Sequence, residues 1–136
     1  MKKAISIISL MLFIGVVALS AQNNKEVTKS DQTQSVNQVK AYYFHANTRC
    51  VTCKAVEDVA KEAIKEYYGD KVQFVVINRE EEINSELVQK YEVSGQTLLI
   101  VKGEKAVNLT NEAFLNARTN PDKLKGKIKS TIDSMM

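Results

Sequence analysis

The only two cysteines of the chain stand close together, in the sequence Cys50-Val-Thr-Cys53. An apolar and aromatic run precedes them at residues 39–44, and a segment of helical periodicity begins directly after Cys50. This spacing lets both sulfur atoms meet within one turn, either as a small disulfide or as a pair of thiolates. A helix N-terminus also stabilises a thiolate through its free N–H groups and its dipole. The pair therefore constrains both the fold and the chemistry.

The start of the chain has the pattern of a secretory signal peptide. Lys2 and Lys3 form a positive start, an apolar run follows at residues 4–18, and small residues precede a cleavage point after Ser20 or Ala21. We predict a signal peptide at residues 1–21 and export to the periplasm or cell envelope. The apolar run is close to the ~18-residue minimum for a membrane span, so an uncleaved anchor is the alternative. Such an anchor is the only membrane contact that we expect.

Export bears on the cysteines, because thiols outside the cytoplasm tend to be oxidised. A disulfide at this spacing closes a very small loop, and a small loop contributes comparatively little stability. The spacing therefore favours a functional disulfide over a structural one.

Residues 22–38 are polar and carry Val27 and Val36 as their only marked hydrophobes. Such a segment buries too little apolar surface to offset its ordering entropy, so we predict a flexible leader before a single domain at residues 39–136. The whole chain has 19 basic and 16 acidic residues and no dense basic block. This composition predicts no nucleic-acid partner.

The domain alternates between strand and helix patterns. Strands are expected at residues 39–44, 72–77, 98–101 and 106–109, and helices at residues 51–68, 80–91, 111–118 and from Pro121 onward. Asn120 before Pro121 is a strong helix start, and Leu124, Ile128 and Ile132 then form an apolar stripe.

These elements predict an α/β fold with a mixed four-stranded sheet, in the order β-α-β-α-β-β-α, and with helices on both faces. The strand at 72–77 is apolar on both faces, which predicts a central position. Because the first three strands alternate with helices, we expect them to be parallel, with an antiparallel edge from the last hairpin. The helix at 80–91 is expected to turn four side chains inward, namely Ile83, Leu87, Val88 and Tyr91.

A strand followed by C-x-x-C at the first turn of a helix, and then by β-α-β-β-α, resembles the thioredoxin-like superfamily over residues 39–136. The matching residues are Tyr43-Phe44 before Cys50-Val-Thr-Cys53-Lys54, and Thr97-Leu-Leu-Ile-Val101 after Tyr91-Glu-Val93. The resemblance implies a minimal three-layer thioredoxin-like fold without cofactor. It also implies protein thiols and disulfides as substrates, served by an unidentified reductant or oxidant.

By this resemblance, Cys50 is the exposed attacking cysteine and Cys53 the resolving cysteine packed beneath it. The order of the two residues at a helix start favours the same roles. Thr97, with its neighbour Gln96, would lie opposite the disulfide and contact substrate. Arg49 either contacts substrate and favours the Cys50 thiolate by its charge, or is a solvated loop arginine.

Three departures make the chain an atypical member. Arg49 stands where thioredoxins have a tryptophan, and the position of their buried acid is taken by Tyr43 or Phe44. The loop before the third strand, residues 94–97, lacks the family's cis-proline. Because a cis bond without proline costs about 3–4 kcal/mol, we expect this loop to be trans or differently shaped.

His45, the only histidine, is expected near the cysteines. It is read as a proton shuttle, a third metal ligand or a polar residue at a strand end. Residues 80–82 form an acidic run that we interpret as a helix start.

Two alternatives to thiol–disulfide exchange use the same motif. A soft-metal module would hold Cu(I) between the two thiolates, although copper-chaperone domains run β-α-β-β-α-β. A non-catalytic adaptor would keep the fold without turnover. No structural zinc site is predicted, because such a site needs four ligands and the chain has two cysteines and one histidine.

Overall fold

The computed structural model describes residues 37–136. The predicted signal peptide at 1–21 and nearly all of the predicted leader therefore lie outside the described residues. Within 37–136, none of the helices combines the length and the apolar character that a membrane crossing requires.

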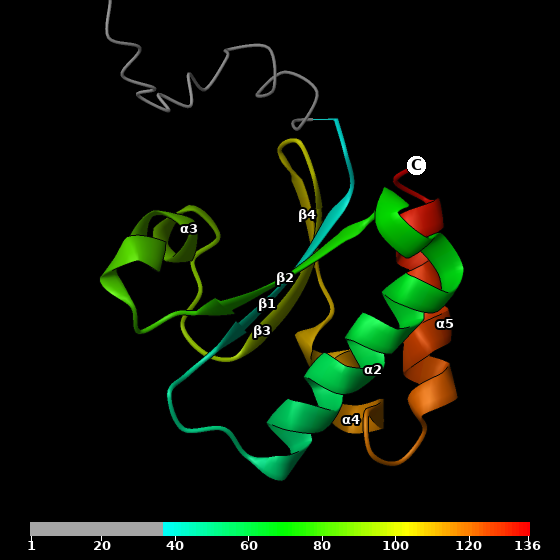
Figure 1. The fold of residues 1–136 in the computed structure, drawn as a ribbon, viewed down its shortest axis with the longest axis horizontal. Helices are drawn as coiled ribbons and strands as arrows, with labels where there is room; N and C mark the ends of the chain where they lie inside the picture. The colour runs from blue at the N-terminus through cyan, green and yellow to red at the C-terminus, as the bar shows by residue number, and fades with distance from the viewer. Residues whose placement is uncertain (1–36) are drawn as a thin grey trace, which may run out of the picture.

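The domain consists of one sheet with helices on both of its faces (Figure 1). Along the chain, the elements are β1 (Lys40–His45), α2 (Val51–Tyr68), the 3-10 turn η1 (Gly69–Lys71), β2 (Gln73–Asn78), the 3-10 turn η2 (Glu82–Asn84), α3 (Ser85–Lys90), β3 (Thr97–Lys102), β4 (Lys105–Asn108), α4 (Thr110–Asn116) and α5 (Pro121–Asp133). The predicted α/β fold with a mixed four-stranded sheet and helices on both faces is confirmed.

The strand order is β2-β1-β3-β4, which puts β2 at an edge of the sheet. The prediction that this strand is central was therefore wrong. Its apolar composition reflects cover on its two faces: Phe74 packs against the core under α2, and Val75 and Ile77 belong to the core under α3. The apolar pattern of a strand indicates that both of its faces are covered, and it does not indicate how many strands lie beside it.

Strand β1 is parallel to β2, but β3 runs antiparallel to β1 and to β4. The expectation of three parallel strands was wrong for β3. A parallel crossover must carry the chain back along a strand of six residues, about 20 Å. The six residues of α3 advance only about 9 Å, so the chain turns at the end of the sheet and re-enters in the opposite direction.

The helix expected at 80–91 begins later than predicted. Side chains hold the segment after β2 in a turn: Asn84 Nδ2 donates to Asn78 O at 2.8 Å, and the Glu80 N–H donates to Asn78 Oδ1 at 3.1 Å. Asparagine side chains compete with helical hydrogen bonds in this way. As a result Ile83, expected to face inward, is 87% exposed.

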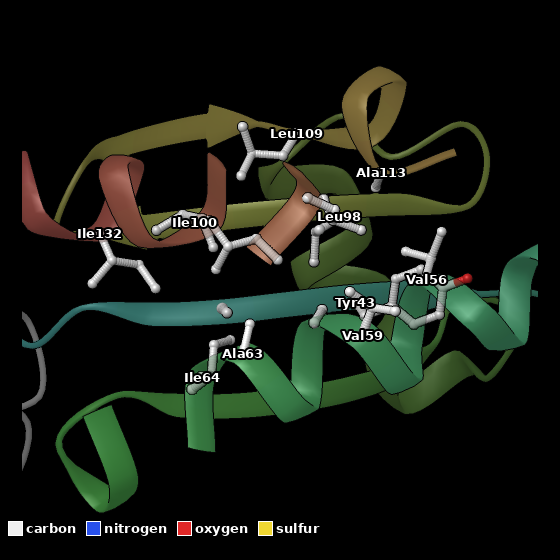
Figure 2. Close-up of a cluster of buried hydrophobic side chains, with 14 of the residues drawn as sticks. Tyr43, Val56, Val59, Ala63, Ile64, Leu98, Ile100, Leu109, Ala113 and Ile132 are labelled. Atoms are coloured by element: carbon white, nitrogen blue, oxygen red, sulfur yellow. The ribbon is translucent and has the colours of Figure 1, made fainter. Parts of the chain in front are cut away.

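The main core lies between the sheet and the helices α2, α4 and α5 (Figure 1). Figure 2 shows Tyr43 of β1 within this core, beside Val56 and Val59 of α2. The predicted stripe of α5 is fully buried here, and Asn120 Oδ1 caps the helix by accepting the Lys123 N–H at 3.2 Å. A smaller core under α3 contains Phe44, Ile77, Val93, Leu99 and Val101.

The two cores predict a contrast between two isoleucines. Ile128 is fully buried, so Ile128→Ala should lower the free energy of unfolding by about 2–5 kcal/mol through lost contacts and a cavity. The matched control Ile83→Ala removes the same atoms from an exposed position and should change it by about 0.5 kcal/mol or less. Urea denaturation followed by circular dichroism measures both, and equal losses would contradict this assignment of the core.

Candidate active site

The two cysteines form a disulfide at the N-terminus of α2. Their Cα atoms are 5.0 Å apart, within the ordinary range for a disulfide. Cys50 is the N-cap residue, in extended conformation, and Cys53 lies in the first turn of the helix. The helix begins at Val51 as predicted, so the motif occupies the junction between the loop after β1 and the helix.

The two sulfur atoms have different surroundings. Cys50 is exposed, whereas Cys53 is only 2% exposed and packs beneath the start of the helix. The backbone N–H of Cys53 donates to Cys50 Sγ at 3.1 Å. A thiolate on Cys50 would keep this donor and the positive end of the helix dipole, and both stabilise negative charge. An incoming group can therefore reach Cys50 from solvent but not Cys53.

Arg49 is tied to the same helix. Its guanidinium forms an ion pair with Glu57 and lies 6.0 Å from the centre of the Tyr43 ring. The arginine is thus neither fully solvated nor an isolated positive charge beside Cys50. Glu57 was not anticipated from the sequence, although it lies two helical turns beyond Cys50 and so near the same end of the helix.

Tyr43 is a functional candidate that the sequence reasoning treated only as a missing acid. Its side chain is fully buried, and its hydroxyl donates to the backbone carbonyl of Cys53 at 2.8 Å. Burial raises the pKa of the Tyr43 phenol above its usual value near 10, and the charge of Arg49 opposes this shift. The group under Cys53 is therefore a neutral hydrogen-bond donor. The alternation of side chains along β1 contained the signal, because it directs Tyr43 toward the face that α2 covers.

Gln96 meets Tyr43 from the other side of the site. The side-chain amide oxygen of Gln96 lies 3.0 Å from the Tyr43 hydroxyl. A phenol has one proton, which serves one acceptor at a time. With the amide rotated by a half turn, Gln96 Nε2 donates to Tyr43 while Tyr43 donates to Cys53, and both contacts are satisfied together. The pair thus connects the loop before β3 to the first turn of α2.

Thr97 lies at the first position of β3, paired in register with Phe44 of β1. Its side chain is only 8% exposed, and its hydroxyl donates to the Gly95 carbonyl at 3.2 Å. Every peptide bond within residues 37–136 is trans, including those of the loop at 94–97. The loop is therefore held by side-chain hydrogen bonds of Gln96 and Thr97.

His45 is half-buried at the end of β1, and its Nδ1 lies 2.9 Å from the Ala46 carbonyl, which accepts when this nitrogen is protonated. In the part of the chain that the structure describes, no three His, Cys, Asp or Glu side chains gather in a way that would hold a metal ion. His45 is therefore not assembled with the cysteines as a third ligand. The acidic residues at 80–82 lie in the turn after β2, where Glu80 accepts the backbone N–H of Asn47 at 2.9 Å.

The contact of Tyr43 with the helix start makes a prediction about stability. Tyr43→Phe removes the donor to a buried carbonyl and leaves Gln96 without a partner, so the free energy of unfolding should fall by about 1–2 kcal/mol. Tyr67→Phe is the matched control, because the ring of Tyr67 is partly exposed at the other end of α2. Urea denaturation of the oxidised proteins provides the comparison. Equal, small losses in both variants would show that the Tyr43 hydroxyl contributes nothing.

The comparisons with known proteins agree on the fold. No protein-family model matches the chain, and no curated protein matches its sequence. Among solved structures, Trxlp from Edwardsiella tarda is similar, with a TM-score of 0.52, 17% identity, and coverage of 74% of this chain and 93% of that one. Thioredoxins from Fasciola hepatica and Malassezia sympodialis each give a TM-score of 0.50. Their identities are 21% and 22%, over 74% of this chain in both cases and over 88% and 83% of their own chains. At these identities the similarity concerns architecture, and the chain has the thioredoxin fold.

Proposed function

We propose that the protein is an exported thiol–disulfide exchange protein in which Cys50 attacks and Cys53 resolves. The observation that carries this proposal is the asymmetry of the pair. Cys50 is exposed, and its sulfur accepts the backbone N–H of Cys53, whereas Cys53 is buried and its own carbonyl accepts the Tyr43 hydroxyl. The thioredoxin fold adds support, because thioredoxins are among its structural neighbours.

The exchange begins with the reduced protein. The Cys50 thiolate attacks one sulfur of a substrate disulfide, so that a Cys50–substrate disulfide forms and the second substrate sulfur leaves as a thiolate. The departing substrate thiolate takes the Cys53 proton, and Cys53 then attacks Cys50 Sγ, which releases the first substrate sulfur as a thiolate. The substrate gains two electrons, and the protein is left with the Cys50–Cys53 disulfide. An external dithiol reductant restores the starting state, and the same steps in reverse oxidise a substrate dithiol.

The substrate is expected to contact the residues around Cys50. Gln96 directly precedes β3 and Thr97 is the first residue of this strand. The Gln96 side chain contacts the Tyr43 hydroxyl beneath the disulfide. Arg49 is partly exposed beside Cys50 and is held by Glu57. In this proposal the three residues position the backbone of a protein substrate, and the pattern at residues 1–21 directs the chain to an envelope compartment where thiols are oxidised.

Matched serine variants test the roles of the two cysteines. Cys53→Ser should retain the attack but not the release, so it should accumulate a mixed disulfide with oxidised insulin. Cys50→Ser should form no such adduct, because the remaining sulfur is buried. Non-reducing electrophoresis and mass spectrometry of the adduct give the readout. Each variant is the control for the other, and equal adducts from both would remove the assignment of roles.

The same preparations separate the alternatives. The wild-type chain should reduce insulin in the presence of a dithiol reductant, and its two cysteines should become free thiols only after reduction. Stoichiometric, tight Cu(I) binding in a competition titration, without insulin reduction, would instead favour the soft-metal module. Neither copper binding nor turnover would favour the adaptor.

A further inference from the structure

Strand β2 leaves one side of its backbone without a partner strand among residues 37–136. It pairs with β1 alone, over the six residues Gln73–Asn78. Proteins usually protect such an edge with a charged side chain, a proline or a bulge. The sequence of β2, QFVVIN, has no charge and no proline, and Val76 near its middle is 40% exposed. The edge thus has the composition of a strand that pairs further.

The two ends of β2 carry opposite charges. At the Gln73 end, a groove of about 470 Å³ runs between the strand and α2. Its walls include the apolar residues Ile64, Val72 and Phe74, and its charged residues are Lys61, Lys65 and Asp70. The exposed Lys71 lies two residues before the start of the strand on this side. This end is therefore apolar with a net positive rim.

At the Asn78 end, the chain continues into exposed Glu80, Glu81 and Glu82. Arg79 lies 3.8 Å from Glu80 and offsets one of these charges, so the net charge at this end is negative. Ile83 follows directly and is 87% exposed. An acidic end with an uncovered apolar side chain thus stands opposite a basic end with an apolar groove.

We propose that β2 is a self-association edge, at which the β2 strands of two copies of this chain pair antiparallel. A two-fold axis through the middle of the strand, near Val75 and Val76, joins the two sheets into one. Because the strands run in opposite directions, the basic end of each copy lies beside the acidic end of the other. A single patch that is complementary to itself is the requirement for a symmetric dimer.

The charge pattern favours a second copy over the chain's own leader. The leader at 22–38 has Val27 and Val36 as its only marked hydrophobes, and its two lysines balance its two acidic residues. Gln38, its last residue, lines the groove and donates to the Lys71 carbonyl at 3.2 Å, but a segment of this composition would neither cover the apolar positions of β2 nor match its two charged ends. The dimer does both, and it adds main-chain hydrogen bonds along the edge.

The pairing predicts a dimer that one substitution weakens. Sedimentation equilibrium of the chain without its signal peptide should show a reversible monomer–dimer equilibrium. Val76→Lys should raise the dissociation constant roughly tenfold or more, because it sets like charges side by side at the strand centre. Leu115→Lys places the same change on α4, where the residue is 73% exposed, and should leave the constant unchanged. Circular dichroism verifies that both variants fold.

Charge reversal tests the complementarity and involves only exposed side chains. Lys71→Glu and Glu81→Lys, at exposed residues that flank the two ends of β2, should each weaken the dimer and reduce its sensitivity to salt, whereas the two together should restore it, because each end then matches the other again. Failure of the double variant to recover would overturn the proposal, as would equal effects of Val76→Lys and Leu115→Lys. A monomer at the highest soluble concentration would overturn it as well. If the β2 amides of that monomer are protected from hydrogen exchange, the edge belongs to the leader instead.

Discussion

The contact between β1 and the first turn of α2 is the interaction on which the site depends. Tyr43 is buried in the main core, and its hydroxyl holds the Cys53 carbonyl at 2.8 Å. A buried phenol must find a partner, because an unsatisfied polar group in the interior is costly. The contact fixes the height and rotation of the helix start above the sheet. It thereby places Cys53 inside and leaves Cys50 at the surface, where the Cys53 N–H reaches its sulfur.

The same hydroxyl extends the contact to the loop before β3. Gln96 joins Tyr43 from that loop, and Thr97 fastens the loop to itself through the Gly95 carbonyl. The strand β1, the start of α2 and the loop before β3 are thus held around the disulfide without a proline in the loop, and among residues 37–136 no carboxylate is buried under Cys53. The group at this position is a neutral phenol, because burial raises the pKa of Tyr43.

The strand order of the sheet determines the positions of both the edge strand β2 and the active site. Strand β1 lies between β2 and β3, and the chain leaves its C-terminal end toward Cys50. Strand β2 lies at the edge of the sheet. The loop after β1 and the turn after β2 meet through the Asn47 N–H and Glu80. In the proposed dimer the two-fold axis places the two active sites at opposite ends of the joined sheet.

The sequence by itself determined the elements whose signals are local. The periodicity of 51–68 and the cap at Asn120 fixed α2 and the start of α5, and the two cysteines with their flanking strand indicated the thioredoxin fold. Only the tertiary structure decided the direction of β3, the edge position of β2 and the exposure of Ile83. These features depend on how far a short helix can carry the chain and on which faces of the sheet are covered. A short stretch of sequence specifies neither. The hydrogen bonds of Tyr43 were decided in the same way, because its partners lie 10 positions along the chain in α2 and 53 positions along in the loop before β3.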